Sequence, residues 1–152
     1  IKKDWKLFCI GKDNGIKKNL IRFAKKLSLE KNIEFLGEVK KVEKILPVAD
    51  IGLLTSHQEG FSNSIMECMA SSIPMIVTDV GGNNEIIENG INGIIVPAHN
   101  PKLLSSAIIS MAKNPNRSKM GILAKETTTK HFSNTKCVNA YIDVYDNLIK
   151  KF

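Results

Sequence analysis

Short apolar runs alternate along this chain with longer segments of helical periodicity. Each run has the length of a β-strand, and the runs fall at 5–10, 32–37, 50–54, 75–77 and 94–96. Strands that alternate with helices predict βαβ units and a parallel sheet. The expected fold class is therefore α/β, a Rossmann-like parallel sheet flanked by helices.

The segments between and after these runs predict helices. In 15–29, apolar residues recur at helical spacing, while several lysines lie on the other faces of the predicted helix. The stripe expected to face the core is Leu20, Phe23, Ala24 and Leu27. A short helix over 39–46 should stop before Pro47, because the residue preceding a proline avoids helical angles. Further helices are expected at 85–88, within 101–131 as two helices joined near 114–115, and from about residue 134.

The segment 57–85, HQEGFSNSIMECMASSIPMIVTDVGGNNE, carries the chain's most informative residues. It begins just beyond the carboxyl end of a predicted strand, where open parallel sheets bind ligands. A Gly/Ser/Asn loop opens a helix there, with acids at Glu59 and Glu67. N–H groups at a helix start receive phosphate oxygens, and carboxylates accept hydrogen bonds from sugar hydroxyls. The segment therefore suits a ligand that has both groups.

Each of these acids also has a purely structural interpretation. Ser64 and Glu67 have the spacing of a capping box, in which the serine caps a helix and the glutamate returns to its backbone N–H. A helix that starts near Ser62 instead places Glu67 one turn in, directed at ligand hydroxyls. Glu59 is, in the structural interpretation, an exposed loop acid.

The segment EGFSNSIME at 59–67 resembles the E-x7-E motif of the retaining GT-B glycosyltransferases, the group 1 or family 4 class. The similarity covers roughly 5–145, and includes Gly11, FLGEV, ADIGLLTS before the motif, and MASSIPMIVTDVGG and NGINGIIVP after it. The resemblance implies a single domain over 1–152, the C-terminal nucleotide-sugar-binding domain of such an enzyme. It also implies an acceptor-binding N-terminal domain and a first strand–helix unit before Ile1.

The resemblance implies roles for ten residues. Glu59 is the candidate catalytic residue, acting on the donor sugar or on charge near its anomeric carbon, and Glu67 binds the ribose. The other expected donor-binding residues are Gly60, Phe61, Ser62, Asn63 and Ser64 at the helix start, Gly37 and Val39 near the base, and Gly11. The segment GKDNG after the first strand departs from the family's tighter Gly-x-Gly, which leaves a ligand contact by Gly11 open.

Charge is placed unevenly along the chain. Residues 51–100 have a net charge of −5 with no Lys or Arg, whereas 1–50 and 101–152 each carry +6. A helix N-terminus supplies only about +0.5 charge against the two or so negative charges of a diphosphate. Cations must therefore come from outside 51–100. The resemblance implies an Arg and a Lys in the preceding strand–helix unit, unless Lys12 or another N-terminal lysine substitutes for them. The isolated chain is not expected to catalyse sugar transfer by itself.

Several partners and cofactors are not expected. Aromatic content is 6% and no recognition motif accompanies the lysines, so nucleic acid is not an expected partner. Cys9, Cys68 and Cys137 lack metal-ligand spacing and are expected to be buried in a reducing cytosol. His57 is a lone loop histidine, and His99, like His131, is expected at the surface. No cofactor or metal is expected beyond the donor substrate.

The lysine-rich ends have two interpretations, solvated helix faces or attraction to anionic lipid. No apolar run approaches the ~20 residues that cross a bilayer. The expected location is the cytoplasm, with peripheral contact at the inner membrane face under the second interpretation.

The function implied by the resemblance is transfer of a sugar, with retention, from a nucleotide diphosphate to an acceptor hydroxyl. A sugar or lipid-linked acceptor in envelope polysaccharide or glycolipid synthesis is expected. One alternative is another GT-B enzyme, such as a sugar-nucleotide epimerase, which the E-x7-E loop disfavours. Another is a non-catalytic nucleotide-sensing or signalling module. A receiver needs a late-strand Lys, which 51–100 lacks.

Overall fold

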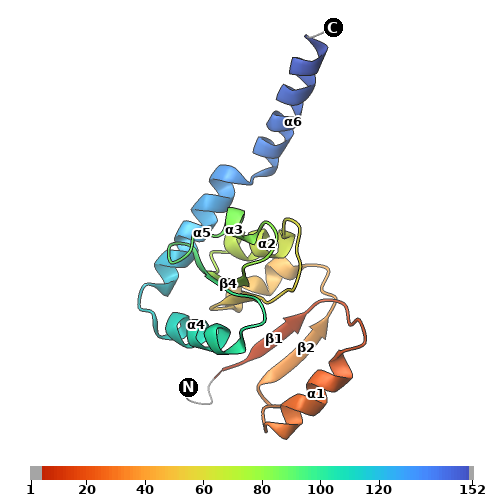
Figure 1. Cartoon of the computed structure of the whole chain (residues 1–152), viewed down its shortest axis with the longest axis vertical. Coiled ribbons are helices and arrows are strands. Elements are labelled where there is room, and N and C mark those ends of the chain that lie inside the picture. Colours follow the sequence, from red (N-terminus) through yellow and green to blue (C-terminus); the bar gives the residue numbers. More distant parts are fainter. Residues whose placement is uncertain (1–4, 151–152) are drawn as a thin grey trace. The chain divides into compact units, whose positions relative to one another are not determined.

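The computed structural model describes residues 5–150, and the chain divides into two compact units, Ile1–Val42 and Glu43–Phe152. Each unit contains its own parallel sheet, accompanied by one α-helix in the first unit and by several in the second (Figure 1). The predicted α/β class with parallel strands is therefore confirmed.

The first unit is a βαβ unit. β1 (Leu7–Ile10) and β2 (Ile33–Gly37) pair in parallel, and α1 (Lys17–Lys26) connects them. Of the stripe expected to face the core, Ala24 is buried, whereas 43% to 60% of the surface of the others, Leu20, Phe23 and Leu27, is exposed. The expected core stripe is therefore wrong for three of its four residues. Periodicity shows which residues share a face, but a unit this small has little to cover that face.

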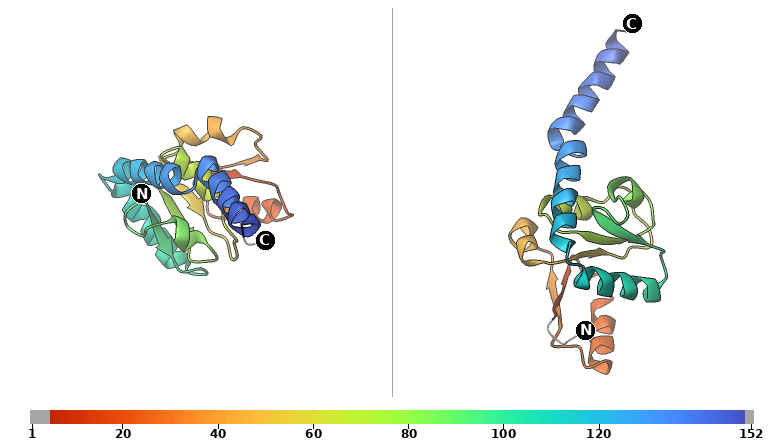
Figure 2. Two further views of the ribbon diagram at one scale, coloured as in Figure 1. Left: turned by 90° about the horizontal axis from the view of Figure 1, so that it is seen from above. Right: turned by 90° about the vertical axis from the view of Figure 1, so that its left-hand side faces the viewer.

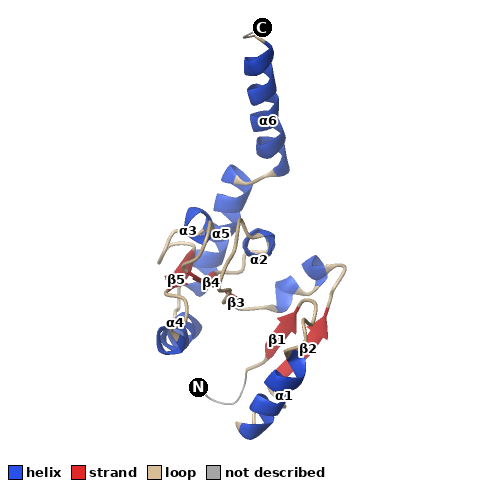
Figure 3. Cartoon of the chain, turned by 45° about the vertical axis from the view of Figure 1, so that its right-hand side comes forward, coloured by secondary structure: helices blue, strands red, loops and turns tan. Residues whose placement is uncertain are grey.

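The second unit is organised around β4 (Met75–Thr78), which lies between β3 (Gly52–Leu54) and β5 (Gly93–Val96). All four residues of β4 are buried. Figure 3 shows these strands among the helices of the unit. The three strands predicted in this part of the chain are confirmed, with boundaries shifted by one or two residues.

Helices cover both faces of this sheet. On one face, Met75 and Val77 pack in a cluster with residues of α2 (Asn63–Ala70), α3 (Asn83–Ile86) and α5 (Arg117–His131). On the other face, Ile76 packs with residues of α4 (Pro101–Lys113) and with Met120. Strands covered on both faces are characteristic of parallel sheets, and this burial holds the carboxyl edge in place.

Two helix predictions need correction. The expected helix over 39–46 is instead a pair of 3-10 turns, Val42–Lys44 and Leu46–Val48, with Pro47 inside the second. Proline is accepted there because the first residues of a turn need no N–H bond. The helix expected at 85–88 is α3, which begins and ends two residues earlier.

The last helix, α6 (Asn134–Ile149), begins where it was predicted, with the Ser133 side chain accepting a hydrogen bond from Lys136 N–H. It extends beyond the end of α5 and buries no residue (Figure 2). Cys137, on this helix, is exposed, so the expectation that it would be buried is wrong. Among residues 5–150, no helix has the length and apolar character needed to cross a membrane.

Candidate functional site

The carboxyl edge of the β3–β4–β5 sheet brings together three loops. The loop after β3 carries Glu59, the loop after β4 carries Gly81 and Gly82, and the loop after β5 carries His99. Because parallel strands end at the same edge, residues far apart in the chain meet here. The predicted motif residues 59–67 therefore lie where an α/β sheet binds its ligands.

The helix start predicted near Ser62 is confirmed. Ser62 is the N-cap of α2, is buried, and makes no side-chain hydrogen bond to the helix. Ser64 is the second residue of the helix and cannot be its cap, so the capping-box interpretation of Glu67 is wrong. The N–H groups of Asn63 and Ser64 lie in the first turn, where the intrahelical ladder supplies no acceptor and the helix dipole favours an anion.

Glu67 lies one turn into α2 and is exposed. Within residues 5–150, no hydrogen bond or ion pair involves its carboxylate, so both oxygens can accept hydroxyl donors. Its charge also affects its neighbour, because burial and then the Glu67 charge raise the pKa of Cys68 to about 11.

Glu59 is half-buried, and its carboxylate is hydrogen-bonded to a residue of its own loop. Ser56 Oγ donates a 2.6 Å hydrogen bond to Glu59 Oε1. Charge-assisted hydrogen bonds of this length are stronger than neutral ones, so they favour one carboxylate orientation. Glu59 is thus not a freely moving loop acid, although its catalytic role stays a prediction.

The Gly81–Gly82 loop packs directly on the backbone of the motif. Gly82 N–H donates to Gly60 C=O at 2.8 Å. Gly81 has a φ of +54°, and a Cβ on it would lie 1.9 Å from Glu59 O. A side chain at Gly81 would therefore displace the Glu59 backbone, which explains why the loop needs glycine here. The space around Gly60 itself is open.

Phe61 connects the motif to the apolar core. Its ring lies 5.4 Å from the ring of Phe132, tilted by 59°. Phe132 packs in turn against the cluster that includes Ile65 and Val77. Such tilted aromatic pairs contribute roughly 0.5–1.5 kcal/mol beyond burial. Phe61 therefore anchors the loop while its own ring stays half exposed.

Two histidines meet at this edge, which the sequence analysis missed. The rings of His57 and His99 stack with centroids 4.4 Å apart and planes within 6°. Both are exposed, as expected for His99, but they lie 42 positions apart, so no local spacing signals the contact. Among the described residues, no three His, Cys, Asp or Glu side chains gather as metal ligands.

The remaining predicted donor residues belong to the first unit. Gly11 N–H donates to Gly37 C=O at 2.9 Å, and both glycines line a pocket of about 160 Å³ with Lys12, Lys17 and Phe35. Gly11 and Gly37 have positive φ angles of 136° and 70°, which other residues rarely adopt. Val39 lies two residues beyond β2 and does not line this pocket.

Comparison with known proteins assigns the family. The sequence profile described as "Glycosyl transferases group 1" matches residues 1–114. The chain belongs to this family. It is 29% identical over 148 residues to the N-acetyl-alpha-D-glucosaminyl L-malate synthase of Bacillus anthracis, covering 97% of this chain and 39% of that protein.

Solved structures of glycosyltransferases share the fold. The C-terminal domain of the group 1 protein LpcC from Francisella tularensis superposes with a TM-score of 0.78 at 27% identity, covering 88% of this chain and 72% of that one. HepE from Anabaena, solved with UDP, gives a TM-score of 0.85 at 19% identity, covering 94% and 41%. The expected GT-B glycosyltransferase fold is confirmed. The chain spans about two-fifths of the length of the Bacillus anthracis relative and of HepE.

Proposed function

We propose that this chain is the donor-binding domain of a longer glycosyltransferase that transfers a sugar from a nucleotide diphosphate to an acceptor hydroxyl with retention. The observation that carries the proposal is the uncapped start of α2, at the carboxyl edge of the sheet, between Glu59 and Glu67. Membership of the group 1 family and the UDP held by the similar HepE support it.

In this proposal the first turn of α2 receives the diphosphate. The N–H groups of Asn63 and Ser64 donate to phosphate oxygens, and Glu67 accepts hydrogen bonds from the ribose. Glu59 acts at the sugar. Stabilisation of the leaving diphosphate is electrostatic, with no metal or cofactor. Gly60, Phe61 and Ser62 complete the donor contacts of this unit.

The first unit, by the same proposal, serves the nucleotide base through Gly37 and Val39, with Gly11 beside them. Because 51–100 has no Lys or Arg, the remaining cations come from another part of the longer protein, or from Lys12 or another lysine of the first unit. An N-terminal domain of the same protein binds a sugar or lipid-linked acceptor of envelope polysaccharide or glycolipid synthesis. The lysine-rich ends support a location in the cytoplasm, at the inner face of the membrane, where clustered lysines are attracted to anionic lipid.

Substitution of Glu67 in the full-length protein tests the donor site. Glu67→Gln removes the charged acceptor and should weaken binding of nucleoside diphosphate sugars about 10- to 100-fold in titration calorimetry. Glu88→Gln makes the same charge change at an exposed position outside α2 and should leave affinity unaltered. Equal donor affinity of Glu67→Gln and the unaltered protein would overturn the assignment.

Product analysis tests the reaction itself. With a panel of labelled nucleotide sugars, the full-length protein should form a glycoside whose anomeric configuration matches that of the donor, as read by NMR. An inverted product would exclude retention. Donor binding without any transfer would favour a nucleotide-sensing module instead.

A further inference from the structure

We propose that Thr78 is a positioning residue for Glu59 and acts through Ser56; this inference rests on the proposed function, in which Glu59 contacts the sugar. Thr78 is the last residue of β4 and is 5% exposed. Its Oγ1 donates a 2.7 Å hydrogen bond to the C=O of Ser56, which lies 22 positions earlier in the chain. The buried central strand thus holds the loop that follows β3.

Ser56 carries this constraint to the carboxylate. Its C=O is held by Thr78, and its Oγ donates to Glu59 Oε1 at 2.6 Å. The other end of the loop is held at Gly60, whose C=O accepts the Gly82 N–H. Glu59 therefore lies between two residues whose carbonyls are hydrogen-bonded to other loops or strands, Ser56 and Gly60, and its carboxylate is bonded to the first of them. This arrangement restricts both the backbone and the carboxylate of Glu59.

Asn83 is also hydrogen-bonded to Thr78, at its backbone carbonyl. Its Nδ2 donates to Thr78 C=O at 2.9 Å, and the residue is fully buried. The hydrogen bonds thus run from Asn83 to Thr78, from Thr78 to Ser56, and from Ser56 to Glu59. The buried Asn83 Nδ2 would be costly to leave without an acceptor, so its bond to Thr78 favours one loop arrangement, although Asn83 Oδ1 is buried without a partner among the described residues.

The position of this relay predicts which step depends on it. It ends at Glu59 and includes no hydrogen bond to Glu67 or to the first turn of α2. Removing the Thr78 hydroxyl should therefore lower turnover while leaving affinity for the nucleotide part of the donor nearly unchanged. Small misplacement of a reacting group is enough to slow a reaction on the order of 100-fold.

The test compares Thr78→Val and Thr78→Ser in the full-length protein. Valine keeps the shape and removes the hydroxyl, so kcat should fall about 10- to 100-fold, while Kd for the free nucleoside diphosphate changes by less than about twofold. Serine keeps the hydroxyl and should restore kcat to within about threefold of the unaltered protein. Steady-state kinetics, titration calorimetry and thermal melting are measured on each variant.

Ser56→Ala, with Ser56→Thr as its hydroxyl-retaining control, tests the same relay at a half-exposed position that is easier to change without unfolding. The inference is overturned if Thr78→Val and Ser56→Ala keep an unaltered kcat. It is also overturned if they lose kcat and nucleotide affinity together and the hydroxyl-retaining variants rescue neither. Absence of transfer by the unaltered protein would overturn the proposed function, and this inference with it.

Discussion

The β3–β4–β5 sheet and the β1–β2 pair are both parallel, yet they are covered very differently. Every residue of β4 is buried, whereas β1 alternates between half-buried and exposed positions. Helices pack on both faces of β4. In the first unit, by contrast, Ala24 of α1 is the single buried residue among residues 5–42. Covered parallel strands form a well-defined edge, so the motif with Glu59 and Glu67 lies on the better supported sheet.

The comparison is most directly tested by truncating one residue in each unit. Ile76→Ala removes a fully buried side chain and should lower the free energy of unfolding by about 2–5 kcal/mol. Phe23→Ala removes a ring that is 60% exposed and should cost less than about 1 kcal/mol. Urea denaturation followed by circular dichroism measures both. Equal losses would mean that the α1 stripe is covered in solution.

Thiol alkylation measures the same difference at single residues. Cys68 is a residue of α2 that packs against the core, and its pKa is raised to about 11 by burial and by Glu67. For the half-exposed Cys9, burial alone raises the pKa. Iodoacetamide needs the thiolate, so at about pH 8 Cys68 should react roughly 100-fold more slowly than a thiol of ordinary pKa.

Peptide mass spectrometry should therefore detect alkylation at Cys9 before Cys68, and labelling of Cys68 should accelerate only as the pH rises toward 11. The exposed Cys137 serves as the control for complete labelling. If Cys68 reacted as rapidly as Cys9, the packing of α2 on the sheet would be looser than described.

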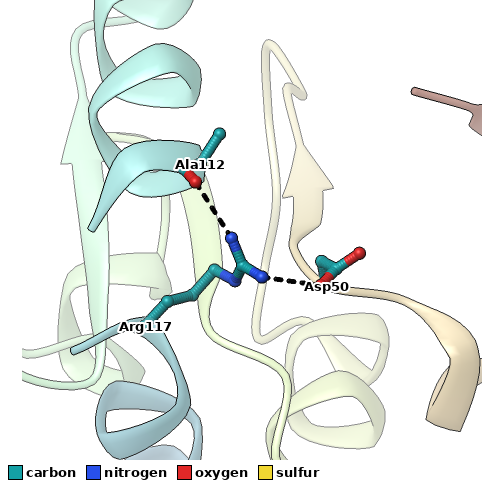
Figure 4. A network of polar contacts seen from close by, with 3 residues as sticks. All are labelled: Asp50, Ala112 and Arg117. Carbon is teal, nitrogen blue, oxygen red and sulfur yellow. Dashed lines mark hydrogen bonds and ion pairs between the residues drawn. The ribbon is translucent and has the colours of Figure 1, made fainter. Parts of the chain in front are cut away.

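The smallest effect is expected at the ion pair beside β3. Arg117 donates to Asp50 Oδ1 at 2.7 Å and to Ala112 C=O at 3.1 Å (Figure 4). The Asp50 side chain is 75% exposed, so Asp50→Asn should lower unfolding free energy by at most about 1 kcal/mol.

The same measurement at roughly 1 M salt should remove most of that difference, because exposed charges are screened. Asp143→Asn on the exposed α6 controls for the change in net charge. A loss as large as that of Ile76→Ala would show that this unit depends on the ion pair rather than on apolar burial.

Much of the fold was predictable from local sequence. The run MIVT at 75–78 has the apolar character of a doubly covered strand, and the helix that starts beyond Ser62 follows from the loop composition before it. Pro47 was misjudged because proline excludes a long helix but not a 3-10 turn. Cys137 was misjudged because cysteine is usually buried, whereas α6 buries none of its residues 134–149.

By itself, the sequence determined the order of strands and helices and the place of the E-x7-E segment at a strand end, because both depend on neighbouring residues. Only the tertiary structure decided that Thr78 holds Ser56 and that His57 stacks on His99. These contacts join residues 22 and 42 positions apart, and they arise because parallel strands end at one edge. No local pattern encodes that proximity.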